Sequence, residues 1–583
     1  MEKPSSKKKG SSKKRPFPTY EPLDKQPQDQ LSESNKSNKL SSIDIDAIDI
    51  AQQLELEEYY KSESLKRKET QIIVKKEEDS RPRIGGIYLI ESKEEEKEPP
   101  PLNKEAAAFL AQLMHQRYDE DDEIKKRILA TEQGSCTLKT ISEDMLTHFN
   151  DGKRIFVNRL RFYQEAAIQE HMLSFKQLCF KDLGFTSKLK GKVEVKCAIM
   201  STMVFELDVL HPLIEAQVPI TLYAERSADD SGPLVEYLGK INMNMIFQSK
   251  WGALKYGVFH SKLILYEFDD RLRVIVPSAN LYALDWEMLS QVIWFQDFFP
   301  LSKTKEEQKD SNNDFKEYLV RYLDYINPKK LQKDVYRQKI NLDKYDFSTA
   351  NACLVASVNG RHQGESRDWF GQNRLGKLSI PKLGANDKII SYQTSSLGKL
   401  NPKFMSSFKS QFIGRVKEGE KKPFSANGDI QDNFRIIFPT QGYVSTSHLG
   451  IERANSIILN DQYWNDCPGF PRKSFYKQVG KSKELDKNLY HAKFIIVTSK
   501  DDKDAITDDT VLYFGSHNFS AGAWGNLEKG GDQIAISNWE IGVVFPPGEG
   551  TKEMKQNIVD GMVLKFPPEK YDSNKGDYPF ILK

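Results

Sequence analysis

Two copies of one short pattern hold the side chains that are best suited to chemistry. Each copy is a histidine, one spacer, a lysine, and then an asparagine that follows two apolar segments. The copies are His260, Lys262 and Asn280, followed downstream by His491, Lys493 and Asn518. Alternate residues of a β-strand face the same way, so each copy places an imidazole and an ammonium side by side.

These three groups together suit a phosphate ester. A lysine supplies positive charge, an asparagine supplies a neutral hydrogen-bond donor, and a histidine can attack phosphorus or move a proton. The chain has only 9 histidines, so two such patterns, each with its own downstream asparagine, are hard to attribute to chance. Because neither copy alone is a complete phosphate site, we expect both to meet in one central cleft.

The segments around each copy predict an α/β architecture that is present twice. The apolar segments after each lysine are short and rich in strand-forming residues, and Asp269-Asp270 marks a tight turn in the first copy. Strand-like and helical stretches alternate ahead of each copy, which predicts a layered fold. Strands are expected near 156–157, 193–205, 218–223, 243–247, 291–295, 352–358, 388–392, 434–439 and 538–545, and a helix over 314–326.

Length and composition indicate how these parts are divided. A chain of 583 residues is too long for one core. Residues 1–104 are rich in Ser, Lys, Glu and Pro, which predicts a disordered tail. We expect a first half over 105–345, which begins with a helix within 104–129, and a second half over 346–583. The polar stretch 303–313 is expected to be a surface insertion.

Charge and cysteine content exclude several classes of protein. The net charge is only +2, so any anion binding must come from local clustering. The 5 cysteines show no Cys-x-x-Cys spacing, which argues against a zinc site or a disulfide framework and fits a reducing compartment. No apolar run of about 18 residues occurs, so no membrane span is expected. The polar start predicts no secretory signal, whereas basic clusters at 7–9 and 13–15 predict nuclear import, with a solvated tail as the alternative.

At the paired patterns the chain resembles the phospholipase D superfamily, and within it the tyrosyl-DNA phosphodiesterases. The general superfamily motif carries an aspartate five residues after the lysine, where this chain has Glu267 and Thr498. Loss of that aspartate in both copies, with an asparagine downstream, looks like the tyrosyl-DNA subgroup rather than a lipase. The resemblance covers about residues 150–583. It implies two similar α-β-α sandwich halves, packed as a pseudo-twofold pair behind the tail.

The resemblance also implies a role for each residue, which spacing alone does not distinguish. It makes His260 the nucleophile that forms a phosphohistidine, and His491 the proton donor and then acceptor. The lysines and asparagines would surround the non-bridging phosphate oxygens. Gln291 and Glu540 are expected to orient the histidines in place of the missing aspartates. No metal or other cofactor is expected, because the lysines supply the positive charge.

The implied substrate is the 3′-phosphotyrosyl bond between DNA and a trapped topoisomerase I peptide, with a 3′-phosphate as product. A loop similar to the family's DNA-contacting loop, and positions near the second asparagine and the first histidine, are candidates for substrate binding. These candidates are Ser395, Ser396, Leu397, Gly398, Lys399, Ser516, Ser520 and Tyr256. A basic and aromatic wall for single-stranded DNA could also form, although an ordinary surface is an equal interpretation of each residue. Its members would be Arg361-His362, Arg367-Asp368-Trp369-Phe370, Arg374, Lys377, Lys403, Lys409 and Arg415.

Two other functions stay open at this point. A lipid phosphodiesterase or transferase of the same superfamily would carry the motif aspartates and membrane-associating segments, and neither is evident. A non-catalytic scaffold that binds DNA ends would have lost at least one histidine or lysine, yet all four are present. We therefore expect a nuclear, monomeric DNA-repair enzyme whose partners are 3′-blocked DNA ends and the attached peptide, with no membrane.

Overall fold

The part of the chain that carries the paired patterns is well defined. The computed structural model describes residues 150–162, 172–183, 193–225, 238–239, 241–248, 254, 257–301, 314–327, 339–379, 388–413, 430–483, 485–502 and 504–582. All of them belong to one compact unit. The expected tail, the helix within 104–129, the insertion at 303–313 and Tyr256 lie outside the described residues.

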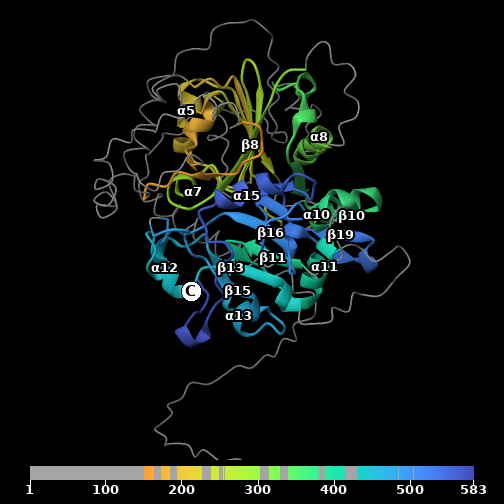
Figure 1. The fold of residues 1–583 in the computed structure, drawn as a ribbon. Helices are drawn as coiled ribbons and strands as arrows, with labels where there is room; N and C mark the ends of the chain where they lie inside the picture. Colours follow the sequence, from red (N-terminus) through yellow and green to blue (C-terminus); the bar gives the residue numbers. More distant parts are fainter. Residues whose placement is uncertain are drawn as a thin grey trace, which may run out of the picture. The chain divides into compact units, whose positions relative to one another are not determined.

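The first large sheet is built from the residues before position 300 (Figure 1). Its spatial order is β2-β1-β8-β7-β6-β3-β4-β5. The strands are β1 (Phe156–Asn158), β2 (Met172–Leu173), β3 (Cys197–Thr202), β4 (Ile220–Glu225), β5 (Met243–Gln248), β6 (Leu263–Glu267), β7 (Leu272–Pro277) and β8 (Val292–Phe298). The helices of this part are α5 (Leu207–Glu215), α7 (Ala283–Glu287) and α8 (Phe315–Ile326).

The second large sheet has the order β15-β13-β11-β16-β17-β20-β9. Its strands are β9 (Cys353–Ser357), β11 (Lys388–Gln393), β13 (Phe434–Phe438), β15 (Phe475–Lys477), β16 (Lys493–Ser499), β17 (Val511–Gly515) and β20 (Glu540–Phe545). Its helices are α10 (Gly371–Ser379), α11 (Pro402–Ile413), α12 (Gln441–Ser445), α13 (Asp461–Asn465), α14 (Ala521–Trp524) and α15 (Lys552–Asp560). Two small sheets accompany it, β10 (Gly360–Gln363) with β19 (Gln533–Ile536) and β18 (Asn526–Glu528), and β12 (Ser396–Leu397) with β14 (Ile458–Leu459).

The two large sheets are copies of one another. Taken across the sheet, β1-β8-β7-β6-β3-β4-β5 corresponds to β9-β20-β17-β16-β11-β13-β15, and the strands also follow the same order along the chain. Every neighbouring pair matches in direction, with four antiparallel contacts followed by two parallel ones. The similarity of the two halves, which the sequence predicts from one repeated pattern, extends through the whole sheet.

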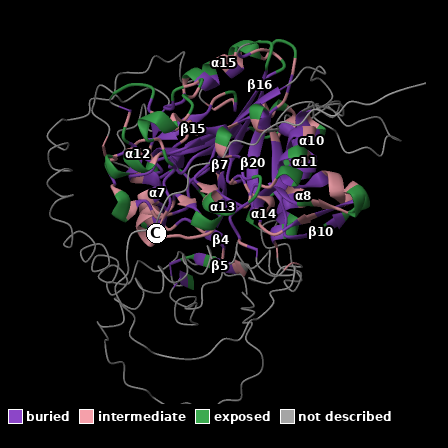
Figure 2. Cartoon of the chain, turned by 90° about the horizontal axis from the view of Figure 1, so that it is seen from below, coloured by how far each residue is buried: buried purple, intermediate pink, exposed green. Residues whose placement is uncertain are grey.

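The sheets are covered on both faces, which explains why their strands are apolar throughout. Helices α5 and α8 lie on opposite faces of the first sheet (Figure 1). Along β6, Leu263 and Leu265 pack into the core that contains α8, while Ile264 and Tyr266 pack into the core that contains α5. Figure 2 shows the strands as the buried interior, with exposed residues on the surrounding helices and loops.

One apolar core is shared by the two sheets. It contains Leu265 from the first sheet and Leu512 and Phe514 from the second, together with Ile558 of α15. The opposite face of the second sheet packs on α11 in a separate core. The predicted α/β fold of two packed halves is therefore confirmed. The expected division at residue 345 stays a prediction, because the halves are joined by this common core.

Replacing Gly542 with alanine should destabilise this fold. Gly542 pairs with Gly515 across β17 and β20, and the ring of Tyr513 lies over it. A Cβ at position 542 would lie 2.6 Å from the Cζ of Tyr513. Overpacking of this kind costs about 1–3 kcal/mol, which chemical or thermal unfolding would measure.

The matched control is Gly442 in α12, where an added Cβ meets nothing within 4 Å. Gly442→Ala should leave the free energy of unfolding unchanged or raise it, because alanine is the better helix former. Equal losses at both positions would contradict the packing argument.

Candidate active site

The residues of each pattern stand at one edge of their sheet. Lys262 immediately precedes β6, Asn280 follows β7, and Gln291 immediately precedes β8. These strands are antiparallel neighbours, so the start of β6, the end of β7 and the start of β8 share an edge. The second sheet repeats this placement with its own lysine and asparagine, and with Glu540 at the start of β20.

The two edges meet, and the two histidines face each other. The ring centroids of His260 and His491 are 6.5 Å apart, and the ring planes are inclined at 85°. Both side chains are buried, with 8% and 6% of their surface exposed. The structure thus brings the two patterns together around a space that suits one phosphate group.

Backbone bridges between the halves fix this meeting. Phe259 pairs with Trp539, and Tyr490 pairs with Ser290. In the first bridge the N–H of His260 donates to the carbonyl of Trp539 at 3.0 Å, and in the second the N–H of His491 donates to Ser290 at 3.0 Å. Each bridge therefore places a histidine beside a residue from the other half, Glu540 at the start of β20 or Gln291 just before β8.

The partner of His260 is a carboxylate from the second half. Its Nδ1 lies 2.7 Å from Oε2 of Glu540. The same carboxylate accepts from the hydroxyl of Ser516 at 2.5 Å and from Nδ2 of Asn538 at 3.2 Å. Ser516 is fully buried. Its hydroxyl therefore positions Glu540, and a contact of Ser516 with substrate stays a prediction.

The partner of His491 is an amide from the first half. Nε2 of Gln291 lies 3.3 Å from Nδ1 of His491, and Oε1 of Gln291 accepts from Ser278 at 2.7 Å. A carboxylate that the sequence did not single out, Asp285 of α7, also lies 3.4 Å from this Nδ1. Alignment of the two copies shows this carboxylate as a difference between them, because the residue five positions after the second asparagine is Ala523.

The asparagines are held in opposite ways. Oδ1 of Asn518 accepts from the hydroxyls of Thr394 and Ser395 and from the N–H of Ser396, at 3.1–3.2 Å, which leaves its amide group as a donor to the site. Asn280 instead donates its backbone and side-chain N–H groups to Asp285 at 2.7 and 2.8 Å. Ser395 therefore positions Asn518.

The two lysines add concentrated positive charge. Lys262 donates to the carbonyl of its neighbour His260 at 2.8 Å, whereas Nζ of Lys493 has no hydrogen-bond partner among the described residues. Burial lowers the pKa of Lys262 to about 8. Burial, followed by the charge of Lys262, lowers the pKa of Lys493 well below its ordinary value. An anion between the lysines would relieve both effects.

Both histidines are shifted toward the neutral form. Burial and then the two lysines lower the pKa of His260 well below 6.5. Burial and Lys493 lower the pKa of His491 to about 4, against the opposing effect of Asp285. At neutral pH both rings are therefore neutral in the free protein. For one ring to carry a charge, a further negatively charged group must bind beside it.

The loop expected to touch DNA is only partly open. Ser396, Lys399 and Ser520 are partly exposed at the rim of the site. Gly398 lies against Ser520, where an added Cβ would come within 3.1 Å of its Cα. The side chain of Leu397 is buried in the second core, so it is not a side-chain contact for substrate.

Several members of the expected basic and aromatic wall are buried, so they are not exposed to DNA in this structure. The guanidinium of Arg374 is buried and pairs with both carboxylate oxygens of Asp314 at 2.7 Å. Trp369 and Phe370 belong to the shared core. Arg367 is committed to its neighbour Asp368 at 3.0 Å. The sequence pattern arises here from packing and ion pairing.

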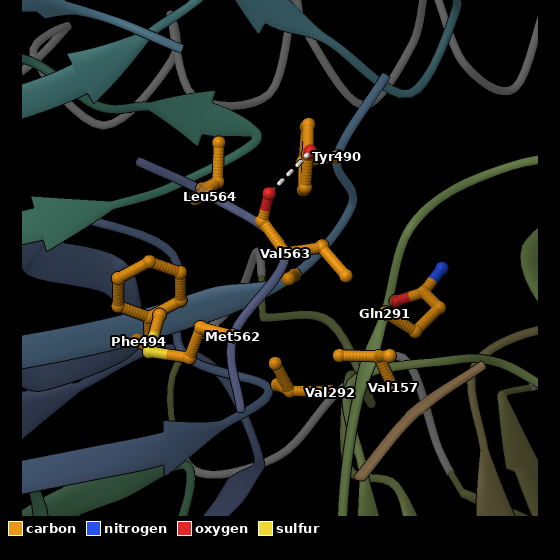
Figure 3. Close-up of a pocket in the computed structure, with 9 residues that line it drawn as sticks. Val157, Gln291, Val292, Tyr490, Phe494, Met562, Val563 and Leu564 are labelled. Carbon is orange, nitrogen blue, oxygen red and sulfur yellow. Dashed lines mark hydrogen bonds between the residues drawn. The ribbon is translucent and has the colours of Figure 1, made fainter. Parts of the chain in front are cut away.

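The side of the site behind Gln291 is apolar. Figure 3 shows a small cavity next to Gln291, lined by Val157 and Val292 of the first sheet and by Phe494 of the second. The segment after α15 contributes Met562 and its neighbours to the lining. The surroundings of Gln291 on this side are therefore mainly apolar.

The described residues contain no group of three or more His, Cys, Asp or Glu side chains arranged to hold a metal ion. They also contain no helix that is long and apolar enough to cross a membrane.

Two packed copies of one sheet, with paired histidine, lysine and asparagine side chains between them, define a member of the phospholipase D superfamily. The sequence model of one family, tyrosyl-DNA phosphodiesterase, matches residues 185–578. The chain therefore belongs to the tyrosyl-DNA phosphodiesterase family.

Known members show how far the likeness extends. The chain is 26% identical over 369 residues to tyrosyl-DNA phosphodiesterase 1 of Arabidopsis thaliana, covering 61% of this chain and 57% of the relative. It is 22% identical over 474 residues to a probable tyrosyl-DNA phosphodiesterase of Schizosaccharomyces pombe, covering 67% and 81%. The match to the Arabidopsis protein thus spans little more than half of that protein. A solved yeast tyrosyl-DNA phosphodiesterase shares the fold, with a TM-score of 0.52 at 19% identity over 74% of this chain and 99% of that one.

Replacing Lys493 with methionine should stabilise the protein. A buried ammonium without a partner carries a desolvation cost of about 1–3 kcal/mol, which a thioether side chain does not. The folded-state pKa of Lys493 lies below the ordinary 10.5, so the cost is present at neutral pH and disappears as the pH rises through 10.5. The gain in the free energy of unfolding that Lys493→Met gives should therefore shrink as the pH rises toward 10.5.

Inorganic phosphate should raise the melting temperature of the wild type more than that of Lys493→Met. Lys153→Met, at an exposed position, is the control. It should change neither the free energy of unfolding nor the rise in melting temperature that phosphate causes. A destabilised Lys493→Met protein would show that the ammonium has a structural partner.

Proposed function

We propose that this chain is a DNA-repair phosphodiesterase that hydrolyses the 3′-phosphotyrosyl bond between DNA and a trapped topoisomerase I peptide. The observation that carries the proposal is the pair of imidazoles 6.5 Å apart. They are flanked by a lysine whose Nζ has no hydrogen-bond partner among the described residues, and by an asparagine whose amide oxygen is held by the loop at 394–396. The family supports the choice of substrate. Metal independence and the release of a 3′-phosphate are parts of the same proposal.

In the first step His260 attacks phosphorus. The contact of Nδ1 with Glu540, at 2.7 Å, holds the ring proton on Nδ1 and leaves the Nε2 lone pair for attack. A P–N bond forms as the bond from phosphorus to the tyrosyl oxygen breaks. Tyrosine has a pKa of about 10, so its oxygen leaves more easily when His491 donates a proton to it.

The lysines and asparagines stabilise the charge that develops in this step. The amide of Asn518 is held in place before the substrate arrives, and the buried ammonium of Lys493 has no hydrogen bond among the described residues to give up. Little reorganisation is therefore needed when charge builds up on the phosphate oxygens. The bound phosphate is itself negative. It therefore raises the pKa of His491 from about 4 toward the range in which the ring can donate a proton.

In the second step His491 is neutral and accepts a proton from water. The water oxygen attacks the phosphohistidine, the P–N bond breaks, and the DNA leaves with a 3′-phosphate. Ser396, Lys399 and Ser520 at the rim are the described candidates for contact with the DNA. The nuclear location, the monomeric state and the peptide partner stay predictions, since the basic clusters lie outside the described residues.

The lipid-directed alternative is less well supported. The positions of the superfamily aspartate, Glu267 and Thr498, lie toward the far ends of β6 and β16. Because a strand rises about 3.3 Å per residue, they are distant from the histidines. Glu267 accepts there from the hydroxyl of Tyr345 at 2.8 Å. The scaffold alternative is disfavoured because both histidines and both lysines are present and meet at one site.

The proposed reaction should proceed without metal. With excess EDTA, the purified chain should convert an oligonucleotide that ends in 3′-phosphotyrosine to one that ends in 3′-phosphate, as resolved on a denaturing gel. An oligonucleotide with a 3′-hydroxyl is the control and should be unchanged. Activity that EDTA abolishes and Mg²⁺ restores would rule out the metal-free mechanism.

The two histidines should differ in what their loss leaves behind. His491→Asn cannot activate water, so a covalent protein–DNA adduct should accumulate and be visible as a shifted band on a denaturing protein gel. His260→Asn lacks the nucleophile, so it should form no adduct and should lose more turnover than the about 10²–10⁴-fold that loss of general acid–base catalysis alone would cost. His448→Asn, on the surface, should behave as wild type. The opposite pattern would exchange the two roles.

A further inference from the structure

Several hydrogen bonds around the asparagines are the same in the two halves. Leu281 donates its N–H to the hydroxyl of Thr202 at 3.1 Å, as Phe519 does to Thr394 at 3.1 Å. Ser278 and Ser516 each donate to the orienting residue of their own half. Five residues after the asparagine the agreement ends. The first half has Asp285, and the second has an alanine.

Asp285 is a buried carboxylate that contacts two parts of the site. It is 2% exposed. Its Oδ2 accepts from the backbone and side-chain N–H groups of Asn280 and lies 3.4 Å from Nδ1 of His491. Burial acts to raise its pKa, but His491, Asn280 and Lys493 outweigh burial and bring it to about 2, so the carboxylate is ionised.

Gln291 and Asp285 lie beside the same nitrogen of His491 but favour different forms of the ring. The amide N–H of Gln291, 3.3 Å away, can donate only to an unprotonated Nδ1, which places the ring proton on Nε2. Asp285 can only accept, so it favours a proton on Nδ1. With the ring proton on Nδ1, the Nε2 lone pair can accept a proton. The imidazolium that results can then donate that proton from Nε2.

We propose that Asp285 is the positioning residue that makes His491 an acid and then a base, by holding a proton on its Nδ1 through both steps. This inference rests on the proposed function. In the first step the imidazolium keeps its Nδ1–H against Asp285 and gives its Nε2–H to the tyrosyl oxygen. In the second step the neutral ring, still protonated at Nδ1, accepts a proton from water at Nε2. Gln291 alone would select the tautomer that cannot act as this base.

The asymmetry between the halves follows from the two roles. His260 attacks without donating a proton, and Glu540 already holds its Nδ1–H at 2.7 Å. Its half of the site therefore needs no second carboxylate. His491 has a neutral partner in Gln291, and Asp285 adds beside the same Nδ1 a negative charge that, together with the bound phosphate, stabilises an imidazolium.

The test uses Asp285→Asn, which keeps an oxygen for the Asn280 N–H groups and removes the charge. Single-turnover rates are measured on two oligonucleotides, one ending in 3′-phosphotyrosine and one in 3′-phospho-p-nitrophenol, whose leaving group needs no acid. General acid–base catalysis contributes about 10²–10⁴-fold, so the variant should lose at least about 10-fold on phosphotyrosine and less than about 3-fold on p-nitrophenol.

Multiple-turnover kinetics on the p-nitrophenyl substrate give a second readout. The variant should release one equivalent of p-nitrophenolate per enzyme in a burst and then turn over slowly, because water attack still needs His491 as a base. The matched control is Glu287→Gln, on the same helix but paired with Arg161 outside the site, and it should resemble wild type.

Equal losses on both substrates would overturn the proposal and leave Asp285 as a support for Asn280 only. Unchanged rates on phosphotyrosine would overturn it as well. Failure of the proposed function is a separate result, since the wild type would then release neither tyrosine nor p-nitrophenolate.

Discussion

The site depends on two short backbone bridges that cross between the halves. Phe259 pairs with Trp539, and Ser290 pairs with Tyr490. Each bridge brings a histidine from one half beside an orienting side chain from the other, so that Glu540 reaches His260 and Gln291 reaches His491. Neither half can orient its own histidine. The geometry of the site therefore depends on the packing of the two halves through their shared core.

Within this frame, the distribution of buried charge decides what the site can do. Two ammonium groups are held where burial lowers the pKa of both, and their charge pushes both imidazoles toward the neutral form. Such an arrangement costs stability in the free protein and favours any anion that enters. Ionised Asp285 and the hydrogen-bonded carboxylate of Glu540 are buried at the same site. Glu540 lies beside the ring of His260, and Asp285 lies beside the ring of His491.

Sequence alone predicts much of this molecule and misses parts for identifiable reasons. The strands and the paired pattern are readable because buried strands are continuous apolar runs and because the pattern occurs twice. Asp285 was missed because a single carboxylate on a short helix resembles any surface residue until the fold turns it inward. The sequence cannot distinguish the roles of Ser516 and Arg374, because a polar side chain carries no sign of whether its partner is a ligand or another buried group, such as Glu540 or Asp314.

The reciprocal exchange of orienting residues has the form of an isologous contact, the kind that joins two identical subunits about a twofold axis. In a dimer of identical chains, every substitution appears on both sides. Here the halves lie in one polypeptide, so each can change alone. Glutamine stands opposite glutamate, and an aspartate in one half stands opposite an alanine in the other. Covalent linkage of the halves is therefore what allows one ring to specialise in attack and the other in proton transfer.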